Sequence, residues 1–206
     1  MDNQQSFEVS KIDADGLINC ILLGDSGTGK SSFLIRFYRN EFSQIFLTTI
    51  GLDKETKVVK IKDSNYKLVL WDTAGQERFR SLPKKYYQNS DGIFIFFDVN
   101  RRITFESVEK WIEDTKNSIN ESKKTNMYLI GSKIDLEREV SKEEAMKLAQ
   151  DKNIKYFECS NKANINNYEI MTHMIMDCYN DEIKNGKKKD GKKLQKGSSK
   201  KKKKCC

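Results

Sequence analysis

The chain has 206 residues, enough for one domain with a sizeable hydrophobic core, and its composition is that of a folded protein. Its net charge of +8 suggests nucleic-acid binding until the charges are located: residues 184–206 hold twelve lysines and one acid, which leaves the 183 residues before them at −3. A mildly acidic body argues against a nucleic-acid-binding surface, and no apolar run approaches the roughly 20 residues that span a bilayer.

Short apolar runs alternate along the chain with segments of helical periodicity. Strands are expected at 17–23, 57–61, 67–71, 93–99, 127–130 and 155–159, and helices at 30–38, 104–119, 141–151 and 168–183. Residues 62–66 have the composition of a turn in an antiparallel hairpin, and Trp111 is expected to face the core from its helix. Strands that alternate with helices predict an α/β fold whose sheet is mostly parallel and covered on both faces.

The segment from Gly24 to Ser32, GDSGTGKSS, is called the phosphate loop here because it matches the pattern GxxxxGKS and lies between a strand and a helix. Its glycines permit positive φ, so that backbone N–H groups point at phosphate oxygens, and the helix N-terminus adds partial positive charge. Lys30 is expected to reach the β- and γ-phosphates, and the Ser31 hydroxyl to bind Mg²⁺. The alternative, an ordinary glycine turn with a stray lysine, leaves the flanking strand and helix unexplained. The expected nucleotide contacts of this loop are Asp25, Ser26, Gly27, Thr28, Gly29, Lys30, Ser31 and Ser32.

Asp135 is the candidate for recognising the base, because it follows the expected strand 127–130 at the carboxyl edge of the sheet. A carboxylate accepts two hydrogen bonds from the N1–H and N2–H₂ groups of guanine, a donor pair that adenine lacks. With adenine the carboxylate would stay unpaired, at a cost of at least about 1–3 kcal/mol. Considered alone, Asp135 is also compatible with capping a helix. Its combination with the phosphate loop favours guanine recognition.

These motifs together resemble the Ras superfamily of small GTPases, and within it the Rab family. The resemblance covers about residues 13 to 183, and the segments that carry it, in the family's order, are Gly24–Ser31, Thr49-Ile50-Gly51, WDTAGQERFR from Trp71 to Arg80, Tyr86-Tyr87, Ser132–Asp135 and Cys159–Lys162. Ser26, TTIG and KLVLWDTAGQERFR are more similar to Rab than to Ras, Rho or Ran sequences. The resemblance implies an α/β, Ras-like P-loop G domain with a six-stranded, mostly parallel sheet, one antiparallel strand and about five helices.

The resemblance also implies a switch that uses GTP, GDP and Mg²⁺. Thr49 would bind Mg²⁺ and the γ-phosphate, Asp72 would hold Mg²⁺ through water, and the Gly75 N–H would contact the γ-phosphate. Gln76 would position the attacking water, which predicts hydrolysis at a slow intrinsic rate on the order of 10⁻⁴ s⁻¹, as in Ras. The implied catalytic residues are Gln76, Lys30 and Thr49.

Two other functions are compatible with parts of the pattern. A guanine-nucleotide scaffold that does not hydrolyse GTP is opposed by Gln76 and Thr49. A P-loop kinase that acts on small metabolites is opposed by Asp135, which disfavours ATP, and by the lack of an evident lid or arginine-rich acceptor site in the sequence.

The base pocket departs from the family pattern at two positions. Ser132 replaces the usual Asn, whose amide braces the phosphate loop and contacts guanine, and the shorter side chain is expected to cost about 1–3 kcal/mol, or about 5–150-fold in affinity. We therefore expect guanine specificity to persist through Asp135 while nucleotide release is faster than is usual for Rab proteins. Asn161 replaces the usual Ala, and partial compensation by its side chain is the alternative. The other contacts implied for the nucleotide are Phe42, Lys133, Ser160 and Lys162.

Rab effectors commonly read an aromatic triad across the two switch segments and the hairpin. Trp71 and Tyr86 match two of its members, whereas Lys54 replaces the expected Phe. A lysine beside two rings makes a cation–π contact, repels an apolar partner or only solvates a strand edge. The implied effector surface consists of Ile50, Lys54, Trp71, Phe79 and Tyr86.

The chain ends in KKCC, with no cysteine four residues from the end, which excludes a C-a-a-X motif. Cys205 and Cys206 resemble the Rab pattern for double geranylgeranylation, and Lys200–Lys204 would add attraction to an anionic membrane surface. A nuclear-localisation or RNA-binding tail is the alternative. The expected organisation is a flexible extension over 1–12, a monomeric G domain over 13–183 and a disordered tail over 184–206.

The resemblance implies partners of three kinds. An exchange factor and a GTPase-activating protein would control the nucleotide, and effectors would bind the switch segments. An escort protein, a prenyltransferase and a GDP-dissociation inhibitor would handle the lipid anchor. The implied location is the cytoplasmic face of an intracellular or plasma membrane, with cycling through the cytosol, and the implied process is vesicle traffic.

Overall fold

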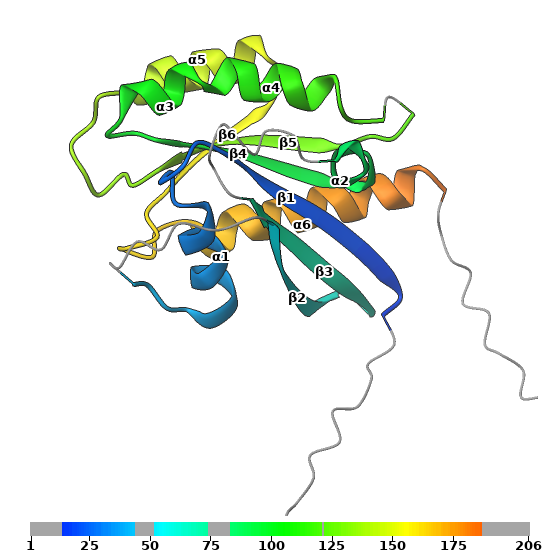
Figure 1. Cartoon of the computed structure of the whole chain (residues 1–206). Coiled ribbons are helices and arrows are strands. Elements are labelled where there is room, and N and C mark those ends of the chain that lie inside the picture. Colours follow the sequence, from blue (N-terminus) through cyan, green and yellow to red (C-terminus); the bar gives the residue numbers. More distant parts are fainter. Residues whose placement is uncertain (1–13, 44–51, 74–82, 121, 187–206) are drawn as a thin grey trace, which may run out of the picture.

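The computed structural model describes residues 14–43, 52–73, 83–120 and 122–186. Strands and helices alternate along these segments as expected, except over residues 52–73, which form two consecutive strands (Figure 1). No helix within these segments is long and apolar enough to cross a membrane.

A six-stranded sheet forms the centre of the described chain, with the order β2-β3-β1-β4-β5-β6. All neighbouring strands pair in parallel except β2 and β3, which are antiparallel. This confirms the predicted sheet with one antiparallel strand. The strands are β1 Gly16–Gly24, β2 Leu52–Ile61, β3 Ser64–Thr73, β4 Gly92–Asp98, β5 Asn126–Ser132 and β6 Lys155–Cys159.

Helices cover both faces of the sheet, with α1 and α6 on one side and α3, α4 and α5 on the other (Figure 1). Only Ser107 separates α3 from α4, so this pair corresponds to the single helix predicted over 104–119. With the pair taken as one interrupted helix, the described residues contain the five helices expected. The bounds are α1 Lys30–Arg39, α2 Lys84–Asn89, α3 Arg102–Glu106, α4 Val108–Lys116, α5 Lys142–Asp151 and α6 Asn167–Lys184.

The hairpin between β2 and β3 is tighter than the sequence suggested. Ile61 pairs with Ser64, so the turn consists of Lys62 and Asp63 rather than of residues 62–66. Lys62 takes a left-handed backbone with φ of 54°, the conformation that tight two-residue turns require. The polar residues that follow were expected in the turn but belong to β3, because cross-strand pairing outweighs their turn propensity.

The central strand β1 is buried on both faces, which explains its continuous apolar sequence. Ile18, Cys20 and Leu22 point into one hydrophobic cluster, under α1 and α6. Ile21 and Leu23 point into a second cluster, under α3, α4 and α5. The period of two along β1 therefore supplies both core layers.

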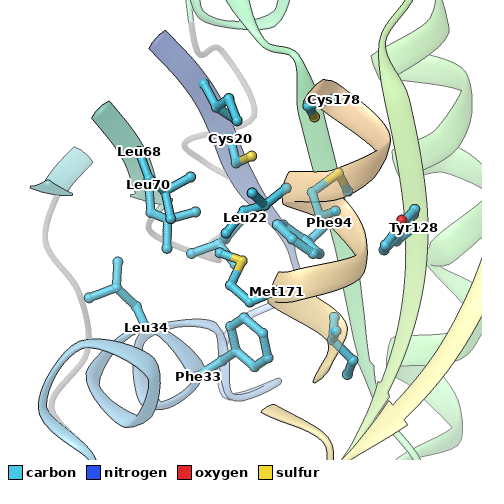
Figure 2. Close-up of a cluster of buried hydrophobic side chains, with 14 of the residues drawn as sticks. Cys20, Leu22, Phe33, Leu34, Leu68, Leu70, Phe94, Tyr128, Met171 and Cys178 are labelled. Carbon is cyan, nitrogen blue, oxygen red and sulfur yellow. The ribbon is translucent and has the colours of Figure 1, made fainter. Parts of the chain in front are cut away.

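Figure 2 shows the first of these clusters, in which Phe33 of α1 lies beside Met171 of α6. Phe33 is fully buried, and its ring meets that of Phe96 edge-to-face at a centroid distance of 5.3 Å. This packing fixes α1 against the sheet only three residues after the phosphate loop enters the helix at Lys30.

The parallel strands bring their carboxyl ends to one edge of the sheet. The last residues of β1, β3, β4, β5 and β6 at this edge are Gly24, Thr73, Asp98, Ser132 and Cys159. Ligands of open α/β sheets bind at such an edge. The sequence-predicted nucleotide contacts follow these strand ends.

Replacement of Phe33 by alanine tests the anchoring of α1. We expect Phe33→Ala to lower the free energy of unfolding by about 3–5 kcal/mol, because a large buried ring leaves a cavity. Leu17→Ala, at a side chain that is 51% exposed, is the matched control and is expected to change it by less than about 0.5 kcal/mol. Urea-induced unfolding followed by circular dichroism measures both, and equal losses would contradict the role given to Phe33.

Candidate nucleotide-binding site

The phosphate loop follows β1 and turns the chain sharply into α1 (Figure 1). Gly24, Gly27 and Gly29 have φ values of 130°, 76° and 89°, a region that L side chains rarely adopt. At Gly24 the space is also closed, since a Cβ atom would lie 2.2 Å from the carbonyl oxygen of Phe96. Glycine is therefore required both by conformation and by close approach, as a loop that wraps around phosphate needs.

Lys30 folds back over the loop that precedes it. Its Nζ donates hydrogen bonds to the carbonyl oxygens of Gly24 at 2.8 Å and Asp25 at 2.9 Å, and the residue is only 4% exposed. Burial lowers the pKa of Lys30 to about 8, an effect that the carboxylates of Asp72 and Asp25 partly oppose. The ammonium group is thus held inside the loop, in surroundings where an added anion would stabilise its charge.

Ser31 and Asp72 bring a hydroxyl and a carboxylate together beside Lys30. The Ser31 hydroxyl donates to Oδ2 of Asp72 at 2.5 Å, and Asp72 is 5% exposed. The neighbouring Thr73 hydroxyl donates to the carbonyl of Leu22 at 2.6 Å, which fixes the end of β3 against β1. Oxygen ligands of this kind suit Mg²⁺, which usually takes one or two carboxylates and completes its shell with phosphates and water. The pair therefore fits the expected cation.

No group of three or more His, Cys, Asp or Glu side chains in the described segments is arranged to hold a metal ion. Magnesium in nucleotide sites usually completes its shell with phosphate oxygens and water rather than with an all-protein cage.

Two residues with no recognisable motif of their own contact the phosphate loop from α4 and from the segment before α3. The Trp111 indole of α4 donates to Oδ1 of Asp25 at 2.8 Å, and the Arg101 guanidinium donates to the Ser26 carbonyl at 3.3 Å. Trp111 was expected only as a core residue, and it is indeed 3% exposed. No local pattern could reveal its second role, because the hydrogen bond joins residues 86 positions apart.

Asp135 lies where a base would be recognised, just after β5, and its side chain is oriented by a neighbour. The Ser160 hydroxyl donates to Oδ1 of Asp135 at 2.5 Å and accepts a hydrogen bond from the Ala163 N–H at 2.9 Å. The next helix, α5, begins only at Lys142. The helix-capping alternative for Asp135 is therefore excluded.

The two unusual positions of the base pocket both contact the phosphate loop. The Ser132 hydroxyl lies 2.6 Å from the Thr28 carbonyl oxygen and 2.9 Å from that of Phe97. A hydroxyl has one hydrogen, so it donates to one of these at a time, and the contact to Thr28 is the shorter. The amide nitrogen of Asn161 donates to the Gly29 carbonyl at 2.9 Å. Asn161, the alternative raised from the sequence, is thus in direct contact with the loop.

The other expected base contacts lie around the same edge. Lys133 has φ of 63°, and its Nζ forms a 2.6 Å ion pair with Asp98, which is 1% exposed. Arg36 of α1 connects the rest: its Nε donates to the Asn161 carbonyl at 2.9 Å, and its guanidinium carbon lies 5.9 Å from the centre of the Phe42 ring. The side chain of Lys162 is exposed. The fold therefore gathers all the described members of the predicted pocket at one edge.

The model of the Ras family matches residues 19–180 of this chain. The chain belongs to the Ras family. It is 36% identical to the Ras-related protein Rab-13 of Canis lupus familiaris over 179 residues, 86% of each chain. It is 41% identical to the Ras-related protein SEC4 of Candida albicans over 154 residues, 74% of this chain and 72% of the relative, and 43% identical to Rab-1 of Theileria parva over 157 residues, 74% and 70%.

These relatives identify the chain as a Rab-type member of the Ras family. It is a GTP hydrolase that works with GTP, GDP and Mg²⁺, and it acts through the regulators and effectors that small GTPases use. The family assignment agrees with the motifs that the sequence analysis singled out.

In this Rab-type GTPase the three described residues of the expected effector surface lie together. The Trp71 and Tyr86 rings meet edge-to-face at 5.0 Å, and the Nζ of Lys54 lies 5.5 Å from the centre of the Trp71 ring. Lys85 places a second ammonium group 5.2 Å from the Tyr86 ring. Of the alternatives for Lys54, the geometry favours a cation–π contact.

Several expected site residues of this GTPase lie outside the described segments. They are Thr49, Ile50, Gly75, Gln76, Phe79, Cys205 and Cys206. Their roles remain predictions from the sequence.

Nucleotide binding is expected to take up a proton above about pH 8. With a pKa of about 8, the Lys30 amine is charged below that pH and loses its charge above it, whereas a bound phosphate raises the pKa and restores the proton. The affinity for GDP is therefore highest below about pH 8 and falls at higher pH. Titration calorimetry of nucleotide-free protein near pH 8.5, in two buffers of different ionisation enthalpy, measures the uptake.

The matched control is Lys30→Arg, because arginine stays charged throughout this range. Its binding is expected to show no difference between the two buffers. Equal heats in both buffers for the unchanged protein would contradict the lowered pKa of Lys30.

Proposed function

We propose that this GTPase is a membrane-attached switch in vesicle traffic, which binds effectors in its GTP state and releases them after hydrolysis. The observation that carries the proposal is the convergence of three elements at one sheet edge: the glycine-rich turn, the buried Lys30 and the Ser31–Asp72 pair. Each suits a different part of a magnesium–nucleotide complex, and all three are held by main-chain or buried contacts.

The phosphates are bound by the phosphate loop, with its backbone N–H groups and the ammonium of Lys30 as the main donors. Ser31 and Thr49 would hold Mg²⁺ directly, and Asp72 would hold it through water. The ion, when bound, neutralises phosphate charge during transfer. Lys30 serves the same end as a fixed positive charge that needs no rearrangement when charge develops.

Guanine is recognised by Asp135, whose carboxylate accepts from the two donors of the base. Ser160 holds that carboxylate in place through the 2.5 Å hydrogen bond to Oδ1. Phe42 and the aliphatic parts of Lys133 and Lys162 cover the base. The ion pair between Lys133 and Asp98 orients the lysine stem along the pocket.

The switch consists of the segments that carry Thr49 and Gly75. Both residues contact the γ-phosphate, so the GTP state fixes the two segments, and loss of the phosphate frees them. Gln76 positions the water for in-line attack. A GTPase-activating protein supplies the arginine that speeds this step, and an exchange factor reloads the site.

Effectors bind the surface formed by Ile50, Lys54, Trp71, Phe79 and Tyr86. The ammonium groups of Lys54 and Lys85 over the two rings make this surface more basic than an aromatic triad would be. An effector that presents a carboxylate beside an apolar side chain suits it better than a purely apolar one.

The membrane anchor consists of two geranylgeranyl groups on Cys205 and Cys206, with Lys200–Lys204 beside an anionic leaflet. An escort protein and a prenyltransferase attach the lipids, and a GDP-dissociation inhibitor carries the anchored protein through the cytosol. Each buried CH₂ contributes about 0.8 kcal/mol, so two long chains hold the protein where one short chain binds only reversibly.

Hydrolysis is tested by Gln76→Leu. We expect phosphate release from preloaded GTP in a single turnover to slow by at least about tenfold, because leucine cannot orient the water. Gln88→Leu, an exposed glutamine of α2, is the matched control and is expected to hydrolyse at the unchanged rate. If Gln76→Leu hydrolysed GTP as fast as the parent protein, the proposed catalytic role would be wrong.

The anchor is tested by replacing both Cys205 and Cys206 with serine in the full-length chain. We expect the variant to move from the membrane fraction to the soluble fraction of cells, because the lysines alone give only electrostatic attraction. Replacement of Ser198 and Ser199 by alanine is the control, and this variant is expected to stay on membranes. A cysteine variant that partitions like the parent would contradict lipid anchoring.

A further inference from the structure

Two successive carbonyl groups of the phosphate loop are each held by a side chain from the end of a different strand. The hydroxyl of Ser132, the last residue of β5, lies 2.6 Å from the Thr28 carbonyl oxygen. The amide of Asn161, two residues after β6, donates to the Gly29 carbonyl oxygen at 2.9 Å. Both side chains are shielded from solvent, since Ser132 is fully buried and Asn161 is 4% exposed.

These contacts act on the opposite side of the loop from the phosphates. Because a trans peptide is planar, the carbonyl of one residue and the N–H of the next point in opposite directions. Holding the Thr28 carbonyl therefore orients the N–H of Gly29, and holding the Gly29 carbonyl orients the N–H of Lys30. Those N–H groups stand at the start of α1, and the N-terminus of a helix favours binding of an anion.

The Gly29 carbonyl has a second hydrogen-bond partner, so its orientation is fixed from two directions. It also accepts the first helical hydrogen bond of α1, from the Phe33 N–H at 2.9 Å. A carbonyl oxygen has two lone pairs, and here the helix and the Asn161 amide occupy one each. Asn161 thereby ties the first peptide of α1 to the segment that follows the edge strand β6.

Asn161 is itself held by two further contacts. Its Oδ1 lies 2.6 Å from the side-chain amide of Asn167, the first residue of α6, which is 2% exposed. Its main-chain carbonyl accepts from Nε of Arg36 at 2.9 Å. A Cβ at Gly29 would lie 2.9 Å from its amide nitrogen, so the missing side chain at Gly29 leaves the space that the amide needs. These surroundings hold the Asn161 amide in position to donate to the Gly29 carbonyl.

We propose that Asn161 is a positioning residue for nucleotide retention, which shares with Ser132 the bracing of the phosphate loop. Ser132 orients one phosphate-facing N–H group and Asn161 the next, so the amide lost at position 132 is replaced from the neighbouring strand. This inference rests on the proposed nucleotide-binding function. Ser132 and Asn161 together replace the contacts that a single Asn at position 132 would make with the phosphate loop, and nucleotide retention is thereby preserved.

The test is the release of a fluorescent GDP analogue from the full-length, magnesium-loaded protein after mixing with excess GDP. Loss of one buried hydrogen bond from the loop predicts about tenfold faster release for Asn161→Ala. Asn161→Ser, whose hydroxyl is too short to reach Gly29, is expected to behave alike, and it decides the matter if the alanine variant fails to fold. Asn117→Ala, at the end of α4, is the matched control and is expected to release at the parent rate.

A second readout separates bracing of the loop from a general loosening of the site. Inosine diphosphate lacks the 2-amino group, so the ratio of IDP to GDP release rates reports on the base contact alone. We expect Asn161→Ala to speed both rates equally and leave this ratio unchanged, whereas Asp135→Asn alters it. Parent-like release from both Asn161 variants would overturn the inference, and so would an acceleration confined to GDP.

The outcomes also distinguish this inference from the function on which it rests. If the parent protein binds GDP and Gln76→Leu blocks hydrolysis while Asn161→Ala releases normally, only the role of Asn161 is wrong. If the parent protein binds no guanine nucleotide, the proposed function and this inference both fail.

Discussion

The hydrogen bonds that Ser132 and Asn161 make to the carbonyls of Thr28 and Gly29 determine how the rest of the site can work. A loop that binds phosphate must point its N–H groups inward, and its carbonyls must then find partners elsewhere. Here those partners come from β5 and β6, strands that lie beyond β4 from the loop's own strand. The orientation of the loop therefore depends on side chains that are far from it in the sequence.

The buried charges of Lys30 and Asp72 are also held in place by hydrogen bonds. Lys30 is placed in the loop by two carbonyl groups, which keep its ammonium close to where phosphate oxygens bind. Its lowered pKa reflects the burial that this placement requires. Next to Lys30, the carboxylate of Asp72 accepts a hydrogen bond from the Ser31 hydroxyl, which fixes its position at the end of β3. Opposite charges are thus prearranged with little motion left to their side chains.

Patterns that lie within a short stretch of sequence were predictable, and contacts between residues far apart in the sequence were not. The apolar run of β1 and the spacing GxxxxGKS each lie within ten residues, so the strand and the loop could be located from the sequence alone. The hairpin turn was placed too broadly, because pairing of β2 with β3 draws Ser64 into the sheet. Asn161 could be raised only as an alternative, since its contact with Gly29 spans 132 positions. The hydrogen bond from Trp111 to Asp25 was not predictable for the same reason, because it joins residues 86 positions apart.

The chain contains two tryptophans, and the fold gives each a different neighbourhood. The indole of Trp111 is bonded to a side chain of the phosphate loop, whereas that of Trp71 lies under an ammonium group beside Tyr86. An indole's emission responds to the charges and hydrogen bonds around it. The protein thus carries two built-in optical probes, one bonded to the phosphate loop and one beside Lys54 and Tyr86, and single-tryptophan variants would let each be followed without an attached dye.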